Sequence, residues 1–81
     1  MSTEIDIDDT LDVKGASCPI PVVKTKQAID DLAPGEVLEV LATDSGSMSD
    51  IDGWASATDG VDLLEQREED GVYKHYVEKT S

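Results

Sequence analysis

The chain has few cysteine, histidine and aromatic residues and no long apolar run. Its 81 residues include one cysteine, one histidine and no phenylalanine, and its aromatic residues are one tryptophan and two tyrosines. A lone cysteine excludes an internal disulfide framework and argues against a structural zinc site, which needs about four Cys, His or carboxylate ligands. No apolar run approaches the ~20 residues of a bilayer-spanning helix. The single thiol must therefore act alone or with a partner molecule.

Positive charge is also scarce. Six lysines and arginines stand against 19 acidic residues, which gives a net charge of −13. This charge repels phosphate backbones and anionic membranes, so we expect neither direct nucleic-acid binding nor membrane association. Self-repulsion destabilises a compact domain in dilute salt, whereas the screening length falls to about 3 Å at molar salt. We therefore expect a protein of a salt-rich cytosol, with an ordinary acidic protein as the alternative. The acidic start, Met1–Asp9, is unlike a signal sequence and predicts a cytoplasmic location.

The pattern of apolar residues predicts one small domain over residues 9–81, after a flexible polar segment at residues 1–8. Leu11 and Val13 alternate with charged residues, which indicates a short strand that ends at Gly15. Between Pro19 and Leu32, steps of three and four predict a helix whose buried face contains Val22, Thr25, Ala28, Ile29 and Leu32. The segment Glu36–Thr43 is predicted to be a strand, with one side formed by Leu38, Val40 and Ala42.

The second half of the chain predicts one helix and two strands. The helix shares one face among Ile51, Trp54, Ala55 and Thr58, and Gly60 is expected to end it. The segments Val61–Leu63 and Val72–Val77 are strand candidates, joined by a hairpin through residues 69–71. The order βαβαββ predicts an α/β (α+β) two-layer sandwich, in which a mixed four-stranded sheet carries both helices on one face.

The cysteine stands in the run Gly15-Ala16-Ser17-Cys18-Pro19-Ile20-Pro21, immediately before the first predicted helix. A helix N-terminus carries roughly half a positive charge, which favours a thiolate over a thiol. Prolines fit a first helical turn because their missing N–H groups cost no intrahelical bond there. Cys18 is therefore the candidate reactive residue, and Pro19 and Pro21 are expected to stiffen the helix start.

Three residues of the first helix are candidate contacts for an anion or a partner protein. Lys24 and Lys26 supply two of the six positive charges and flank the predicted apolar face within about two turns of Cys18. Val23 is expected to be exposed near the thiol, where an apolar contact would help a partner to dock. The plainer alternatives are solvated helix flanks for the lysines and a stray surface valine.

Other polar and aromatic residues fit ordinary structural roles better than chemical ones. His75 has no evident orienting partner, so we expect a strand residue rather than half of a Cys–His pair. Trp54 is expected to pack in the core rather than to stack on RNA. Asp44 and Asp50 are equally consistent with a turn and a helix cap or with a metal-ligand pair.

The chain resembles the TusA-like (SirA-like) family of sulfur carriers. The family's Cys-Pro-X-Pro motif is matched by Cys18-Pro19-Ile20-Pro21, and the approach Leu11–Gly15 looks like the family's lead-in. A second likeness is Thr43-Asp44 followed by Asp50-Ile51. The resemblance implies a sulfur atom carried as a persulfide on Cys18, with Gly15 and Asp12 in supporting positions, and it implies no other cofactor and no metal.

By this resemblance, the protein is expected to be a sulfurtransferase-type carrier rather than a stand-alone multiple-turnover enzyme. It would receive sulfur from a donor protein of the cysteine desulfurase or rhodanese type and pass it to an acceptor in tRNA thiolation or molybdenum-cofactor assembly. We expect a monomer. The alternative is a regulatory or redox-sensing adaptor that uses Cys18 to bind a partner. A dithiol oxidoreductase is excluded because no second cysteine is present to resolve a mixed disulfide.

Overall fold

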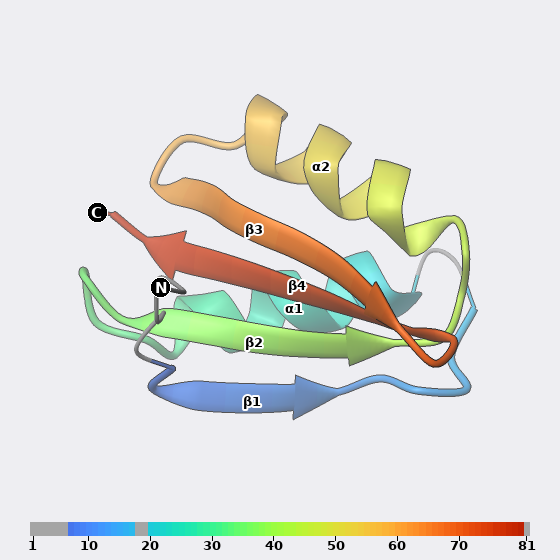
Figure 1. The fold of residues 1–81 in the computed structure, drawn as a ribbon. Coiled ribbons are helices and arrows are strands. Elements are labelled where there is room, and N and C mark those ends of the chain that lie inside the picture. Colours follow the sequence, from blue (N-terminus) through green and yellow to red (C-terminus); the bar gives the residue numbers. More distant parts are fainter. Residues whose placement is uncertain (1–6, 18–19, 81) are drawn as a thin grey trace, which may run out of the picture.

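A computed structural model describes residues 7–17 and 20–80. Within these residues the chain forms six elements in the predicted order. They are β1 (Asp9–Asp12), α1 (Ile20–Asp30), β2 (Val37–Ala42), α2 (Ser47–Ala57), β3 (Val61–Glu69) and β4 (Val72–Lys79). The predicted α+β architecture is confirmed, since the strands form one mixed sheet and the two helices pack on one side of it (Figure 1).

The strand order in the sheet is β1-β2-β4-β3. Strands β1 and β2 are parallel, while β4 runs antiparallel to both β2 and β3. Because β1 and β2 are parallel and each leads into a helix, their carboxyl ends and the starts of both helices lie at the same end of the molecule (Figure 1). This arrangement brings the loop after β1 close to the loop after β2.

The core lies between the sheet and the helices. Leu38, Val40 and Ala42 of β2 are fully buried on the helix-facing side, which confirms the predicted alternation. Val77 of β4 and Ile51 of α2 are also fully buried in the same cluster. On α1, Thr25 and Ile29 are buried, and Val22 and Ala28 are partly buried against this cluster, as is Leu32 just after the helix. The spacing of three and four therefore identified the correct helix face.

The opposite side of the sheet carries no helix and combines charged side chains with the apolar residues Val37 and Leu41. Its centre is Tyr76, which is buried although the surface around it is charged. The Tyr76 hydroxyl donates to Glu39 Oε2 at 2.9 Å, and the Arg67 guanidinium lies 5.6 Å from the centre of the ring. Arg67 also pairs with Glu65. Charged side chains therefore cover the Tyr76 ring on this side of the sheet, where no helix packs.

The strand predicted at Val61–Leu63 is too short, because β3 continues to Glu69. Its second half is rich in charged residues, which have low intrinsic strand preference, but pairing with β4 holds it in the sheet past an irregularity between Leu63 and Glu65. The hairpin turn contains only Asp70 and Gly71. Their φ angles of 52° and 80° fit the turn type that matches strand twist.

The other boundaries differ by a few residues. Strand β1 ends at Asp12 rather than near Gly15, and α2 ends at Ala57, before Gly60. Asp8, the last residue of the predicted flexible segment, is already hydrogen-bonded to β2. Its backbone N–H donates to the Val37 carbonyl at 2.9 Å, and its carboxylate accepts from the Val37 N–H at 2.8 Å. Residues 1–6 of that segment lie outside the described residues.

Candidate functional site

The loop of residues 13–17 leads from β1 toward Cys18. The Val13 N–H donates to the Leu41 carbonyl at 2.8 Å, which continues the pairing with β2 for one residue beyond β1. The Asp12 carboxylate accepts from the Lys14 N–H at 2.9 Å and lies 3.8 Å from the Lys14 ammonium, so Asp12 stabilises the turn. Gly15 follows with φ of 85°, a conformation that glycine adopts without a Cβ penalty.

Thr43 connects this loop to the loop that follows β2. Its Oγ1 atom accepts a 2.8 Å hydrogen bond from the backbone N–H of Gly15. The next residue, Asp44, forms a turn in which its carboxylate accepts from the Gly46 N–H at 3.0 Å. The Asp44 carbonyl accepts from the Ser47 N–H, also at 3.0 Å. The turn interpretation of Asp44 is confirmed, and Asp50 lies in the first turn of α2, where its negative charge is favoured.

Cys18 and Pro19 lie outside the described residues, so the predicted thiolate at a helix start stays a prediction. The residues on either side are described. The Ile20 N–H donates to the Ser17 carbonyl at 2.9 Å, and α1 begins at Ile20, two residues after Cys18 in the sequence. Pro21 is buried in the first turn, and its carbonyl accepts a 2.7 Å bond from the Thr25 hydroxyl. The start of α1 is thus firmly packed.

The outer surface of α1 near its start is apolar and free of acid. Ile20 and Val23 are each 43% exposed, as the helical position of Val23 predicts. Lys24 and Lys26 are also exposed, on a helix whose first turn contains no acidic residue. Lys26 faces away from the loop of residues 13–17, because it lines a hollow near the other end of α1. The roles of Val23, Lys24 and Lys26 stay predictions.

His75 is fully buried in the middle of the sheet, with partners that the sequence did not indicate. The Gln66 amide nitrogen donates to the Met48 carbonyl at 2.8 Å and lies 3.0 Å from His75 Nδ1. Nδ1 is therefore the acceptor, and the neutral ring donates from Nε2 to the Ser47 hydroxyl at 3.1 Å. Burial lowers the pKa of His75, which keeps the ring neutral. His75 thus ties the start of α2 to the sheet.

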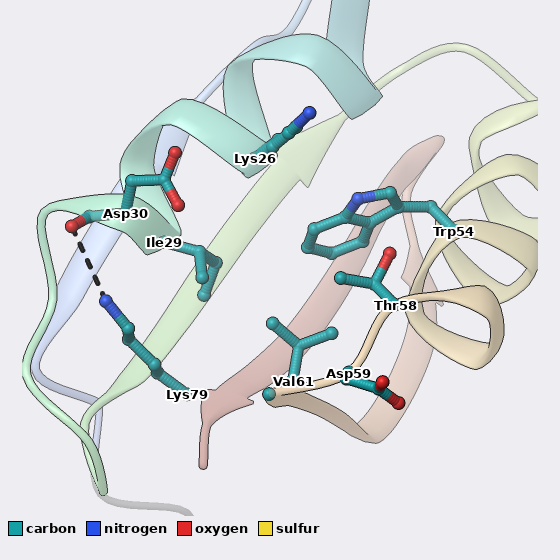
Figure 2. Close-up of a pocket in the computed structure, with 9 residues that line it drawn as sticks. Lys26, Ile29, Asp30, Trp54, Thr58, Asp59, Val61 and Lys79 are labelled. Carbon is teal, nitrogen blue, oxygen red and sulfur yellow. Dashed lines mark hydrogen bonds between the residues drawn. The ribbon is translucent and has the colours of Figure 1, made fainter. Parts of the chain in front are cut away.

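A hollow of about 120 Å³ lies between the two helices at the end of the molecule where they finish. Figure 2 shows Ile29 from α1, Trp54 from α2 and Val61 from β3 converging on it. Trp54 is half-buried and packs against the core, as predicted, but it is not enclosed by the core. The remaining lining residues are Lys26, Asp30, Thr58, Asp59, Gly60 and Lys79, whose charges offset one another.

Within the described residues, no group of three or more His, Cys, Asp or Glu side chains comes together in a way that suits a metal ion. None of the helices described is long and apolar enough to pass through a membrane.

Comparison with known proteins agrees with the geometry. The sequence profile of the family described as Sulfurtransferase TusA matches residues 9–79. A protein of Halobacterium salinarum, named as a candidate sulfur carrier, is 78% identical over 99% of both chains. The sulfur carrier protein TusA of Allochromatium vinosum is 39% identical, over 93% of this chain and 97% of its own.

Among solved structures, the SirA-like protein of Desulfitobacterium hafniense has the same fold. Its TM-score is 0.71 at 28% identity, and the match covers 90% of this chain and 99% of that one. The residues that the family profile matches, 9–79, include the connection from β1 to α1 that contains the cysteine. The chain therefore belongs to the TusA family of sulfur carrier proteins.

Proposed function

We propose that this protein accepts a sulfane sulfur as a persulfide on Cys18 and relays it to a second protein. The observation that carries the proposal is the start of α1 at Ile20, two residues after the only cysteine of a sulfur-carrier family member. Unpaired N–H groups at a helix start favour negative charge on a nearby sulfur, both in the thiolate and in the persulfide anion. Moderate activation suits a carrier, because a very acidic thiol is a weak nucleophile.

The transfer needs no oxidant or reductant. The Cys18 thiolate attacks the outer sulfur of a persulfide on the donor protein, forming a new S–S bond while the donor's own S–S bond breaks and its thiolate leaves. The same exchange then moves the sulfur onward when an acceptor thiolate attacks the persulfide on Cys18. Because the chain has no second cysteine, the sulfur leaves only to another molecule. This makes the protein a shuttle rather than a stand-alone enzyme.

The partners we propose are a donor of the cysteine desulfurase or rhodanese type and an acceptor in tRNA thiolation or molybdenum-cofactor assembly. The exposed surface of Ile20, Val23 and Lys24 supports docking of a protein, since it presents apolar area next to a cation in a chain of net charge −13. The same net charge disfavours direct binding of tRNA. A salt-rich cytosol is the proposed setting, because concentrated salt screens this charge.

The decisive experiment is intact-protein mass spectrometry after incubation with a persulfide donor. We expect the wild-type protein to gain the mass of one sulfur atom and Cys18→Ala to gain none. A second step mixes the loaded protein with an acceptor thiol protein and follows the loss of that sulfur. Equal gain in both versions would contradict the proposal. Loading without onward transfer would favour the regulatory or redox-sensing adaptor.

The docking surface is tested by a matched pair of substitutions. Val23 and Leu64 are exposed to nearly the same extent, at 43% and 42%, but Leu64 lies on β3. Val23→Asp is expected to slow loading from a donor protein several-fold, whereas Leu64→Asp is not. Neither should change loading from a small persulfide such as cysteine persulfide, because that reaction needs no docked protein. Equal slowing by both substitutions would exclude a specific surface on α1.

The salt-rich setting is tested by the unfolding temperature in increasing KCl. Screening of the carboxylates is expected to raise the unfolding temperature continuously between dilute and molar salt. An unchanged unfolding temperature would identify an ordinary acidic protein.

A further inference from the structure

We infer that the hydroxyl group of Thr43 is a positioning group for sulfur relay. It holds the loop of residues 13–17 through the hydrogen bond from the Gly15 N–H, and that loop leads directly to Cys18. The inference rests on the proposed function, because relay by Cys18 is what the loop would serve. Thr43 itself takes no part in the exchange of sulfur atoms.

Besides the bonds within residues 12–17, three hydrogen bonds join the loop to other described parts of the molecule. Its first residue is held to β2 by the bond from the Val13 N–H to the Leu41 carbonyl, and its last is bonded to α1 through the Ser17 carbonyl and the Ile20 N–H. Both bonds join backbone groups, so they would also form with other residue types at those positions. The bond from Gly15 to Thr43 holds the middle of the loop, and there the acceptor is a side chain. The conformation of this loop therefore depends on the residue type at position 43.

Thr43, the acceptor in this contact, is held in place by the residues on both sides of it in the sequence. Thr43 follows Ala42, which is fully buried at the end of β2. The loop after β2 is anchored again three residues beyond Asp44, since the Asp44 carbonyl accepts from the Ser47 N–H and the Ser47 hydroxyl accepts from buried His75. Thr43 thus transmits the position of the sheet to the loop before Cys18, across 28 residues of sequence.

The contact is exposed, so its loss should shift the loop population without unfolding the domain. A neutral hydrogen bond of this kind corresponds to a factor of roughly 2–10 in a conformational equilibrium. Valine has the same shape as threonine but no acceptor, and serine keeps the acceptor. Thr43→Val is therefore expected to slow sulfur transfer roughly 2- to 10-fold, while Thr43→Ser stays near the wild-type rate.

The control is Thr58→Val, the same substitution at the C-cap of α2, where the side chain lines the hollow at the far end of the molecule. The second-order rate constant for loading from cysteine persulfide is measured for all four proteins, together with the unfolding temperature. The exchange rate of the Gly15 amide hydrogen is measured by NMR. We expect faster amide exchange and slower loading in Thr43→Val alone.

Two results would overturn the inference. One is a loading rate for Thr43→Val equal to that of Thr58→Val, and the other is a Thr43→Ser protein as slow as Thr43→Val. If the wild-type protein accepts no sulfur, the proposed function fails separately. The rate of Cys18 alkylation by iodoacetamide then decides the inference. A change of at least about 2-fold in Thr43→Val alone supports positioning, and equal rates in all four proteins exclude it.

Discussion

Each end of the helical layer contains a glycine of positive φ whose N–H group is hydrogen-bonded. The acceptor is a side chain at one end and a backbone carbonyl at the other. At the loop end, formed by residues 13–17 and 43–46, Gly15 has φ of 85° and its N–H donates to a side chain, Thr43 Oγ1. At the hollow end, formed by the residues that line the hollow and by residues 31–36, Gly35 has φ of 92° and its N–H donates to the Lys79 carbonyl at 2.6 Å. The loop end contains the residues that directly precede Cys18 in the sequence. Of these two glycines, only Gly15, at the end where relay is proposed, has its N–H held by a side chain.

The largest effect that separates the ends is expected from His75→Ala compared with Lys79→Met. Loss of the buried imidazole leaves a cavity and deprives the Ser47 hydroxyl and the Gln66 amide of a partner, which costs about 2–5 kcal/mol. Lys79 donates to the Leu32 carbonyl at 2.8 Å near the end of α1, and its loss costs about 0.5–1.5 kcal/mol.

Urea unfolding of both variants and of the wild-type protein measures the two free energies. Equal losses would show that the anchor of α2 on the sheet is no stronger than the lysine contact at the hollow end. The expectation that the His75 contacts contribute more to the free energy of unfolding than the Lys79 contact would then be wrong.

A pH titration measures separately what His75, which anchors α2 at the loop end, contributes to stability. The pKa of His75 is lowered by burial, so between that value and the unfolded value of about 6.5 the unfolded chain binds more protons than the folded one. Stability is then fully present above about pH 6.5, falls as pH falls through the lowered pKa, and levels off below it. The slope cannot exceed about 1.4 kcal/mol per pH unit for one proton.

The measurement is the free energy of unfolding against pH for the wild type and for His75→Ala. The difference between the two curves isolates His75 from the carboxylates, which titrate in both proteins. A constant difference between pH 7 and pH 5 would show that the folded protein protonates His75 as readily as the unfolded chain does.

The sequence predicted the elements whose pattern is local. Strand β2 differs from its predicted bounds by one residue at each end, because its buried side reads Leu38, Val40 and Ala42 without interruption. The helix faces followed from steps of three and four. The charged half of β3 was missed because Glu, Gln and Arg carry no strand signal of their own, and pairing with β4 decides the outcome there.

For the site, the sequence predicts the reactive cysteine but not the long-range contacts around it. The motif predicts a helix from Pro19 onward, and within the described residues α1 begins at Ile20. Burial of His75 was within reach, since alternation puts it on the same face as Val77. Its partners were not, because Ser47 is 28 residues away and meets the ring only when α2 docks on the sheet. The bond from Gly15 to Thr43 also spans 28 residues, and no local pattern encodes it.

A smaller effect is expected from the pair Gly15→Ala and Gly35→Ala. Both glycines have positive φ, and an added Cβ would meet no atom within 4 Å at either, so each substitution carries only the backbone cost. That cost is about 1–2 kcal/mol for a residue forced into the left-handed region. The two variants should lose similar amounts of stability, but only Gly15→Ala should also slow sulfur loading.

Urea unfolding and the loading rate from cysteine persulfide are the two measurements. Slower loading in both variants would mean that general loosening of the domain controls relay. The two ends would then differ in their hydrogen bonds but not in their effect on sulfur loading.

The smallest effect is expected from Gly53→Ala, a substitution between the two ends. Gly53 is exposed in the middle of α2, has no positive φ, and would place a Cβ with no atom within 4 Å. Alanine in a helix interior is more favourable than glycine by roughly 0.5–1 kcal/mol, so the variant should be more stable by that amount. Its loading rate should equal that of the wild type, because α2 is strengthened without a change at the loop of residues 13–17. A change in loading rate with this gain in stability would show that the stiffness of α2 itself reaches Cys18, and the hydrogen bond to Thr43 would no longer be needed to explain control at the loop end.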